Sequence, residues 1–426
     1  MSERGITTIT LKQINKEKVY QYIYRTKQTS KLQIVQDLKM GLSTVSQNLN
    51  VLEEEGLIQR DGYFESTGGR KAQVIQIVSD VRISIGIGIL KKMFHIVAID
   101  LYGKVIAKDT IDLDYSDTEE YYEKVANKID EFIEEYKYQK ERILGVSIAT
   151  QGIISPDGSG VMYGTIMNNV KMRLSDFSSK LPYPCRLVHD SKAAAYLELW
   201  NHSELDSAVV FLLNRNLGGA IITNRKVHEG SFMHSGVIEH ICINSDGPLC
   251  YCGNRGCLET YCSANSLSEI AGMSIKEFFE KLRENKEENI KQIWKEYLKH
   301  LAFAMRNLNL VVDGPIIISG YLAPYFMESD LNYLLKQINS SLPFEFPKEN
   351  LIVGTNGQYT PAIGAALSLR PLYALRQLVQ RTAYRRAFFY RLKGAKMIIT
   401  TTGFVVYKKS DIAKRKFQTC FTKMEK

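Results

Sequence analysis

Residues 240–259 constrain the possible fold more than any other segment of the chain. This segment reads HICINSDGPLCYCGNRGCLE and brings together one histidine and three cysteines: His240, Cys250, Cys252 and Cys257. Thiolates and a neutral imidazole form a Cys3His set that suits tetrahedral Zn2+ and leaves no coordination position open for a substrate. Gly253 and Gly256 allow the tight backbone bends that bring the sulfurs together. The spacing therefore predicts a structural zinc site.

The alternative interpretation is that these residues are ordinary buried thiols. Free cysteines are commonly buried in proteins of a reducing compartment. Three cysteines within eight residues, arranged around two glycines, favour metal binding over that alternative. The neighbouring Cys242 and Cys262 are better interpreted as thiols outside the metal set.

Length and composition indicate a multidomain globular protein. A chain of 426 residues predicts roughly three structural units. Its residues are 45% hydrophobic and 24% charged, and no apolar run is long enough to span a bilayer. The first twenty residues lack the apolar stretch of a signal peptide. Seven cysteines, mostly clustered, favour a reducing compartment over a disulfide framework. We therefore expect a cytoplasmic protein that does not contact membranes.

The net charge of +9 is concentrated in the C-terminal tail. Residues 371–426 contain fourteen Lys and Arg but two Asp and Glu, a net charge of +12, so the rest of the chain carries −3. One interpretation of this tail is an arm that binds nucleic acid through its basic and aromatic residues. The preferred interpretation is either a segment without a selected function or an unstructured extension, because no recognised module fits it.

The first eighty residues are predicted to begin with three helices. Helical periodicity indicates one helix around residues 17–25 and a second through residues 32–38. After a turn at Gly41, Ser43 is expected to cap a third helix that ends at Gly56. Small polar side chains are expected on the outward face of this third helix, beside Ser43, at Thr44, Ser46, Gln47 and Asn48.

A β-hairpin is predicted after these helices. Residues 57–66 indicate two strands joined by a tight turn at Asp61 and Gly62, and residues 72–78 a further strand. Three helices followed by a hairpin is the winged helix-turn-helix order, in which the third helix enters the major groove of double-stranded DNA. Its polar side chains suit base edges, while Arg70 and Lys71 suit a phosphate or the minor groove.

The alternative for residues 1–80 is a small helical dimerisation or docking domain. Eleven Lys and Arg against nine Asp and Glu leave a net charge of only +2 there, a weak electrostatic signature for DNA binding. The order of helices and strands favours the DNA-binding interpretation.

Strands and helices alternate in residues 81–370, which predicts an α/β fold. Together with the cysteine-rich segment and the TGGR sequence of the wing, this order resembles the ROK family of sugar-responsive repressors and sugar kinases. The resemblance implies a two-lobed, actin-like sugar kinase fold with a zinc loop beside a sugar cleft. It also implies a homo-oligomer, dimer or tetramer, and for the repressors a palindromic DNA operator and a small carbohydrate effector.

The phosphate-binding motifs of the family kinases are missing. Where those kinases have an Asp-Gly-Thr loop after the first strand, this chain has Gly88-Ile-Leu-Lys-Lys92. At the second Gly-Thr-Gly loop it has Asn214-Arg-Asn216. Asp190 matches the position of the family's catalytic base, but a base without a phosphate site transfers nothing. We expect Asp190 either to accept hydrogen bonds from a sugar or to act as a helix N-terminal acid.

The expected sugar-facing residues are also altered. The family places Glu-x-Gly-His before the zinc loop, whereas this chain has Val237-Ile-Glu239-His240. Val237 cannot accept a hydrogen bond, but Glu239 can partly substitute for the missing carboxylate. Glu259, after the last zinc cysteine, is retained. Ligand binding is thus predicted at Asp190, Glu239 and Glu259.

The sequence therefore predicts a DNA-binding regulator, most simply a repressor of carbohydrate-utilisation genes, whose kinase-like body has lost catalysis. One alternative is an active sugar kinase with an attached DNA-binding domain. Another is a regulator that no longer senses sugar, for which Val237 is the main support. The predicted domains are residues 1–80, 81–370 and the tail 371–426.

Overall fold

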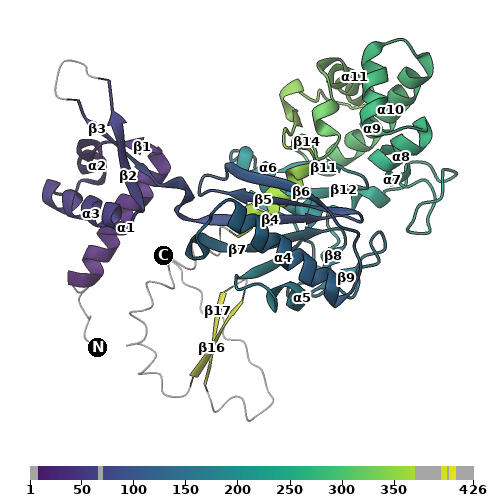
Figure 1. Ribbon diagram of the computed structural model, residues 1–426. Helices are drawn as coiled ribbons and strands as arrows, with labels where there is room; N and C mark the ends of the chain where they lie inside the picture. Colours follow the sequence, from purple (N-terminus) through teal and green to yellow (C-terminus); the bar gives the residue numbers. More distant parts are fainter. Residues whose placement is uncertain (1–7, 66–70, 370–394, 401–402, 409–426) are drawn as a thin grey trace. The chain divides into compact units, whose positions relative to one another are not determined.

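The computed structural model describes residues 8–65, 71–369, 395–400 and 403–408 (Figure 1). The chain divides into two compact units, residues 1–369 and 370–426. In the second unit the described residues form one antiparallel hairpin, made of β16 (Ala395–Thr400) and β17 (Gly403–Lys408). The other residues of the basic tail lie outside the described residues. The two interpretations of the tail, a nucleic-acid-binding arm or an extension without a selected function, both depend on them.

The first unit begins with three helices and a small antiparallel sheet, the predicted winged helix-turn-helix order (Figure 1). Its helices are α1 (Thr8–Thr26), α2 (Lys31–Leu38) and α3 (Leu42–Glu54). The sheet has the order β1-β3-β2, from β1 (Gln28–Thr29), β2 (Ile58–Tyr63) and β3 (Gln73–Ile77). Apolar residues at helical spacing on α3 (Val45, Leu49 and Leu52) are buried against α1 and α2.

Ser43 does not cap α3, contrary to the sequence prediction. The N-cap is Gly41, and Val45 N donates to Gly41 O at 3.0 Å, so the helix begins at Leu42. Gly41 caps without a side-chain hydrogen bond. Glycine is accepted at this position, and the preceding Lys39 already ends α2 in the left-handed conformation with φ of 51°. The turn between the two helices is therefore too short to leave Ser43 outside the helix.

The tight turn predicted at Asp61 and Gly62 is also wrong. Both residues lie inside β2, where the register with β3 shifts between Arg60 and Tyr63. Gly62 has φ of 73°, a conformation that suits the extra residue of a β-bulge. Phe64 N donates to Ala72 O at 2.9 Å, so the strands stay paired beyond Asp61. The chain reverses after Phe64 instead.

Two five-stranded sheets form the rest of the first unit, and they share one topology. The first has the order β10-β7-β4-β5-β6 and the second β13-β12-β11-β14-β15. Read from β6 to β10 in the first sheet and from β13 to β15 in the second, both have the order third, second, first, fourth, fifth strand along the chain. This duplicated arrangement confirms the predicted two-lobed α/β fold. The first sheet contains β4 (Ile83–Ile89), β5 (Met93–Ile99), β6 (Val105–Asp112), β7 (Ile143–Thr150) and β10 (Cys185–His189). The second contains β11 (Ala208–Leu213), β12 (Leu217–Thr223), β13 (Lys226–Val227), β14 (Ile316–Ser319) and β15 (Leu351–Val353).

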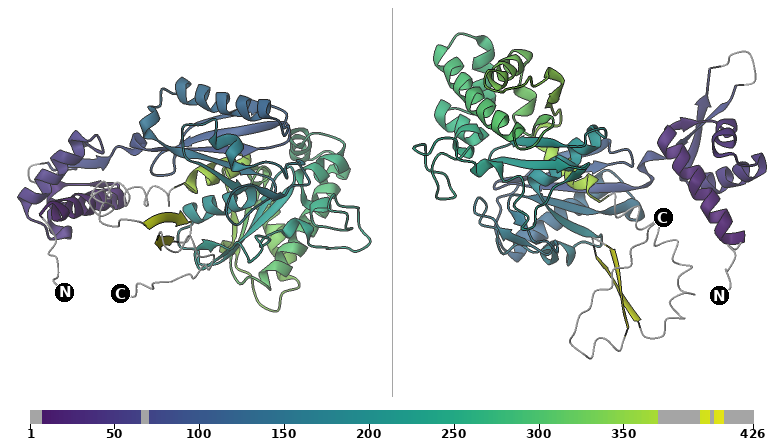
Figure 2. Two further views of the ribbon diagram at one scale, coloured as in Figure 1. Left: turned by 90° about the horizontal axis from the view of Figure 1, so that it is seen from below. Right: turned by 180° about the vertical axis from the view of Figure 1, so that it is seen from behind.

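Helices cover both faces of each sheet (Figure 2). On the first sheet, α4 (Glu119–Glu135) and α5 (Leu174–Ser178) enclose one core with β4, β5 and β7. A short hairpin of β8 (Ile153–Ile154) and β9 (Val161–Tyr163) lies between β7 and α5 in the chain. The second sheet is covered by α7 (Glu259–Cys262), α8 (Ala264–Ala271), α9 (Ile275–Glu284), α10 (Glu288–Asn309) and α11 (Glu328–Asn339).

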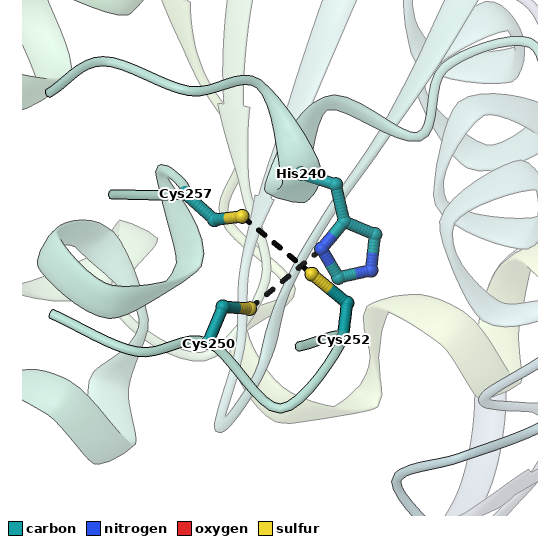
Figure 3. Close-up of side chains that lie close together, drawn as sticks. All are labelled: His240, Cys250, Cys252 and Cys257. Atoms are coloured by element: carbon teal, nitrogen blue, oxygen red, sulfur yellow. Dashed lines mark hydrogen bonds between the residues drawn. The ribbon is translucent and has the colours of Figure 1, made fainter. Parts of the chain in front are cut away.

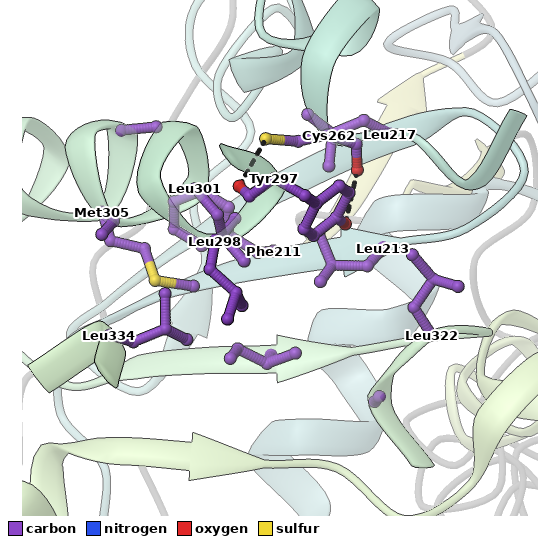
Figure 4. Close-up of a cluster of buried hydrophobic side chains, with 14 of the residues drawn as sticks. Phe211, Leu213, Leu217, Cys262, Tyr297, Leu298, Leu301, Met305, Leu322 and Leu334 are labelled. Carbon is purple, nitrogen blue, oxygen red and sulfur yellow. Dashed lines mark hydrogen bonds between the residues drawn. The ribbon is translucent and has the colours of Figure 1, made fainter. Parts of the chain in front are cut away.

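In the core of the second lobe, which contains β11–β15, side chains of the strands pack against side chains of the helices (Figure 4). Phe211 and Leu213 of β11 pack against the apolar face of α10, which includes Leu301 and Met305. Tyr297 OH donates to Cys262 O at 2.8 Å, which satisfies the one polar group of this ring inside the core. Cys262 is completely buried here, as expected for a thiol outside the metal set.

Two helices, α6 (Asp190–Asn201) and α12 (Thr360–Leu367), lie between the sheets and hold the lobes together. They touch through small residues: a Cβ added at Gly364 would lie 1.7 Å from Ala193 O. A side chain at Gly364 would not fit, so the backbones of α6 and α12 pack closely at this point. None of the described helices has the length and apolar character needed to cross a membrane.

Candidate functional site

The four predicted metal ligands converge on one point (Figure 3). Their donor atoms, one each from His240, Cys250, Cys252 and Cys257, all lie within 4.8 Å of one another. With Zn–S bonds of about 2.3 Å, two sulfurs of a tetrahedral site lie about 3.8 Å apart. The Sγ atoms of Cys252 and Cys257 are 3.7 Å apart, and Cys250 Sγ lies 3.7 Å from His240 Nδ1. The cluster therefore fits a tetrahedral metal ion.

Local backbone geometry explains why the loop closes around this point. Gly256 has φ of 69°, and a Cβ at this position would lie 1.5 Å from Asn244 O. Burial raises the pKa of Cys257 to about 12 and also raises that of Cys250. A divalent cation ionises such thiols and satisfies their charge, so the donor set and its surroundings suit Zn2+.

A cleft opens directly beside the metal cluster. Its lining includes Asp190 at the start of α6, Leu217 at the start of β12, and both Val237 and Glu239 from the segment that ends in the ligand His240. Tyr251, between two metal ligands, also lines the cleft and packs edge-on against His240 with ring centroids 5.1 Å apart. The metal loop therefore forms one wall of the cleft.

Asp190 and Glu239 both present buried carboxylates to this cleft. Asp190 Oδ1 accepts hydrogen bonds from Ser191 N at 2.7 Å and Ser191 Oγ at 3.2 Å, and burial raises the pKa of Asp190. Glu239 Oε2 is buried without a hydrogen-bond partner among the described residues. Burial raises the pKa of Glu239 to about 8, and the charges of Asp190 and Glu259 add to the rise. An unpartnered buried oxygen costs stability unless a ligand satisfies it.

Glu259 is placed differently from the other two predicted ligand-binding residues. It is buried but is absent from the cleft lining, and its two oxygens accept hydrogen bonds from Asn216 Nδ2 at 2.8 Å and Leu217 N at 2.6 Å. Burial raises the pKa of Glu259 to about 7. Glu259 thus stabilises the turn before β12 through hydrogen bonds to Asn216 and Leu217. Of these three residues, Leu217 lines the cleft.

Asparagine side chains of the β11–β12 turn bond to neighbouring elements. In the β11–β12 turn, Asn214 is buried and its Oδ1 accepts a hydrogen bond from Tyr321 N at 3.0 Å. Asn216 is bonded to Glu259 as described above. Arg215 lies near enough to His95 that its charge adds to burial in lowering the pKa of His95 to about 4. The turn is therefore held by its own side chains.

The β4–β5 turn is short and basic. Leu90 N donates to Met93 O at 2.9 Å and closes the β4–β5 hairpin. Lys91 and Lys92 are exposed at its tip. No glycine lies between Leu90 and Met93 in this turn.

The predicted DNA-facing residues that the structure describes lie on α3 and directly after the wing. On α3, Ser43 and Gln47 are exposed, whereas Thr44, Ser46 and Asn48 are partly buried. Ser46 Oγ donates to Leu42 O and Asn48 Nδ2 donates to Thr44 O, each at 2.8 Å. Gln47 is thus the most available amide side chain of the set. Lys71 is exposed after the wing, and Arg70 lies outside the described residues.

Sequence reasoning missed several cleft residues, including Gln151, Tyr163, His189 and Tyr251. Tyr251 could have been found, because any residue between Cys250 and Cys252 must lie at the edge of the metal loop. The other residues come from separate elements, and their convergence depends on how the lobes pack.

The fold and the site together define a protein with a winged helix-turn-helix domain joined to a two-lobed, kinase-like body. The sequence profile of the ROK family matches residues 82–370. The chain belongs to this family.

Relatives of known name include sugar repressors. The chain is 26% identical over 353 residues to the xylose repressor of Caldicellulosiruptor bescii, an alignment that covers 77% of this chain and 88% of that protein. It is 28% identical over 267 residues to the N-acetylglucosamine repressor of Escherichia coli O6:H1, covering 61% of this chain and 64% of that protein. Among solved structures, a ROK family transcriptional regulator described as a homologue of the E. coli MLC protein matches the fold. Its TM-score is 0.61 at 19% identity, with 84% of this chain and 96% of that chain covered.

Proposed function

We propose that this protein is a DNA-binding transcription regulator, a repressor of carbohydrate-utilisation genes that a small carbohydrate releases from DNA. One observation carries the proposal: helices and strands in winged helix-turn-helix order share a chain with a two-lobed, kinase-like body that has a cleft beside the metal cluster. In this proposal residues 1–80 bind an operator, residues 81–370 sense the effector, and the tail 371–426 has no assigned role. The protein acts in the cytoplasm.

The body is proposed to have lost phosphoryl transfer. Catalysis of this reaction depends on positioning the phosphates and neutralising their charge. Asn214 and Asn216 are bonded inward where backbone amides would meet phosphates, and the β4–β5 turn offers exposed lysines in place of glycines. Asp190 consequently serves ligand binding.

Phosphoryl transfer is testable directly. We expect purified full-length protein, incubated with radiolabelled ATP and a panel of hexoses and pentoses, to transfer no more phosphate than the variant Asp190→Asn. The physical reason is that the β4–β5 and β11–β12 turns present lysine and asparagine side chains where we expect phosphate-binding glycines. Turnover by the wild type that Asp190→Asn abolishes would establish an active sugar kinase instead.

The cleft is proposed to bind a small sugar through Asp190 and Glu239. Both carboxylates are buried, and Glu239 has an oxygen that no described residue satisfies. A sugar hydroxyl can donate to this oxygen, whereas the hydrocarbon side chain of Val237 gives the neighbouring wall an apolar surface. The names of the two relatives make D-xylose and N-acetyl-D-glucosamine the first sugars to test.

Calorimetry on full-length protein tests this assignment. At pH 9, above the raised pKa of Glu239 of about 8, Glu239→Gln is expected to weaken binding of the sugar roughly 10-fold or more, because hydrogen bonds to a charged group contribute about 1.5–3 kcal/mol. The control is Glu229→Gln, an exposed glutamate outside the cleft lining. Equal affinity of wild type and Glu239→Gln would remove Glu239 from the binding site. Silence of the wild type towards every monosaccharide would favour a regulator that no longer senses sugar.

Zinc is proposed as a structural cofactor, held by His240, Cys250, Cys252 and Cys257. A four-ligand site leaves no open position for catalysis. Its contribution would be to fix the loop that carries Tyr251 and to anchor the segment with Val237 and Glu239. A homodimer is also proposed, since winged helix-turn-helix domains commonly read two half-sites of a palindrome.

Selection of genomic DNA fragments by full-length protein tests the regulatory function. The proposal expects enrichment of a palindromic sequence near carbohydrate genes. Recovery of no preferred sequence would refute it.

A further inference from the structure

One contact between the DNA-binding domain and the body is made by Tyr24. Tyr24, in the last turns of α1, stacks on Tyr102 in the β5–β6 turn, with ring centroids 5.1 Å apart and planes 6° from parallel. Tyr24 OH donates to Leu101 O at 3.0 Å. Leu101 N in turn donates at 2.9 Å to Ser79 O, in the short helix Ser79–Val81 that connects β3 with β4. Leu101 is therefore bonded both to α1 and to the connection between the two domains.

The β5–β6 turn that receives Tyr24 is rigid. Asp100 is buried, and its Oδ1 accepts hydrogen bonds from Tyr102 N at 2.8 Å and Lys104 N at 3.0 Å. Asp100 N also donates to Lys104 O at 3.0 Å. The carboxylate and the backbone bridge thus tie Asp100, Tyr102 and Lys104 together, which fixes the shape of the turn 100–104.

The far end of α6 rests on this same turn. A Cβ added at Gly103 would lie 2.5 Å from Trp200 Nε1, so the indole packs directly on the turn backbone. Trp200 is in the last turn of α6, and Asp190, at the cleft, is the first residue of that helix. Twelve helical residues span about 18 Å. A small shift of Asp190 along the helix axis therefore reaches the turn that holds Tyr24.

One polar group at the contact with α1 has no hydrogen-bond partner among the described residues, which favours release of the contact. The hydroxyl of Tyr102 is buried without a hydrogen-bond partner among the described residues. An unsatisfied buried hydroxyl lowers the stability of the docked arrangement, because water would satisfy it when the domains separate. A contact of this kind can occupy two states of similar free energy, which a ligand can shift.

We propose that α6 transmits occupancy of the cleft to the turn 100–104, which docks or releases Tyr24 and so changes the position of the DNA-binding domain. The inference rests on the proposed function and adds its route of regulation. It assigns Trp200, Tyr102 and Tyr24 as positioning residues: none of them lines the cleft, and none lies on the recognition helix α3.

The test uses full-length protein and two measurements. Trp200→Ala and Tyr102→Ala are compared with Tyr136→Ala, a matched control from another stacked tyrosine pair, Tyr136 and Tyr138, whose ring centroids are 5.9 Å apart. Hydrogen–deuterium exchange of residues 20–26 reports docking of Tyr24 without any ligand. Fluorescence anisotropy with the selected operator, with and without D-xylose or N-acetyl-D-glucosamine, reports transmission.

Faster exchange in residues 20–26 is expected for Trp200→Ala and Tyr102→Ala, and none for the control. The sugar that weakens operator binding by the wild type about 10-fold, within the usual range of allosteric coupling, should change binding by these two variants less than about 2-fold. Unchanged exchange, or a full sugar response in both variants, would overturn the inference. If the wild type binds its operator and neither sugar changes that binding, the result counts against the proposed function. The exchange rates of residues 20–26 in Trp200→Ala and Tyr102→Ala then decide whether these two residues hold Tyr24 against the body.

Discussion

Replacing Cys257 by serine is expected to release zinc from the protein and to disable its response to sugar while operator binding persists. Cys257 is completely buried, and its Sγ lies 3.7 Å from that of Cys252, so the loss of one thiolate breaks the tetrahedral set. Structural zinc contributes directly to folding free energy. We expect Tm of the body to fall by roughly 5–10 °C, since each kcal/mol moves the Tm of a domain this large by about 2–4 °C.

Zinc content by mass spectrometry, calorimetric Tm and operator binding are measured on the same preparations. The control is Cys242→Ser, which removes an exposed cysteine from the same segment without touching the cluster. Wild type and control should each contain one zinc ion per chain, and Cys257→Ser much less. Normal zinc content in Cys257→Ser would refute the assigned ligand set. Parallel loss of sugar response and operator binding would show that zinc supports the whole chain and not the cleft alone.

Truncating Gln47 to alanine is expected to weaken operator binding by about 5- to 150-fold, the range that corresponds to the 1–3 kcal/mol of a good base contact. Gln47 is exposed on α3, whereas Ser46 and Asn48 bond to their own helix backbone. Its side chain is thus the amide on that face most available to an adenine edge. Anisotropy with the selected operator measures the effect, and single-base variants of the operator show which position loses discrimination.

Gln36→Ala provides the comparison, because Gln36 is an exposed glutamine on the preceding helix α2. It should change operator affinity less than Gln47→Ala. Both variants should keep the wild-type Tm, since neither side chain is buried. Equal weakening by the two variants would place the base contacts elsewhere on the domain.

The metal cluster and the order of elements were accessible from the sequence because short spacing determines both. Three cysteines within eight residues must lie close together wherever the loop lies, and the 3.6-residue period of Val45, Leu49 and Leu52 specifies the buried face of α3. The alternating strands of the body similarly predicted its α/β layers.

Turn chemistry was harder to predict because it depends on the partner strand. The Asp61-Gly62 pair is typical of a hairpin turn, yet β3 continues to pair as far as Phe64 and converts the same glycine into a bulge. Ser43 has a good capping side chain, but the short turn after Lys39 places the helix start before it.

Contacts between distant segments could not be predicted from local pattern. The sequence grouped Glu239 with Glu259, whereas the folded chain directs Glu239 to the cleft and ties Glu259 to Asn216 and Leu217. The stacking of Tyr24 on Tyr102 likewise joins residues from separate domains. Such pairs depend on the packing of whole elements, which no residue spacing records.

Operator binding by full-length protein, titrated with a panel of monosaccharides, tests the central claim most directly. The account predicts sequence-specific binding to a selected palindrome that one small sugar weakens about 10-fold, as expected for an allosteric coupling of ordinary size, with no phosphate transferred to that sugar. Specific binding that no monosaccharide changes, or phosphorylation of the sugar that releases the DNA, would contradict a sensor that has exchanged catalysis for regulation.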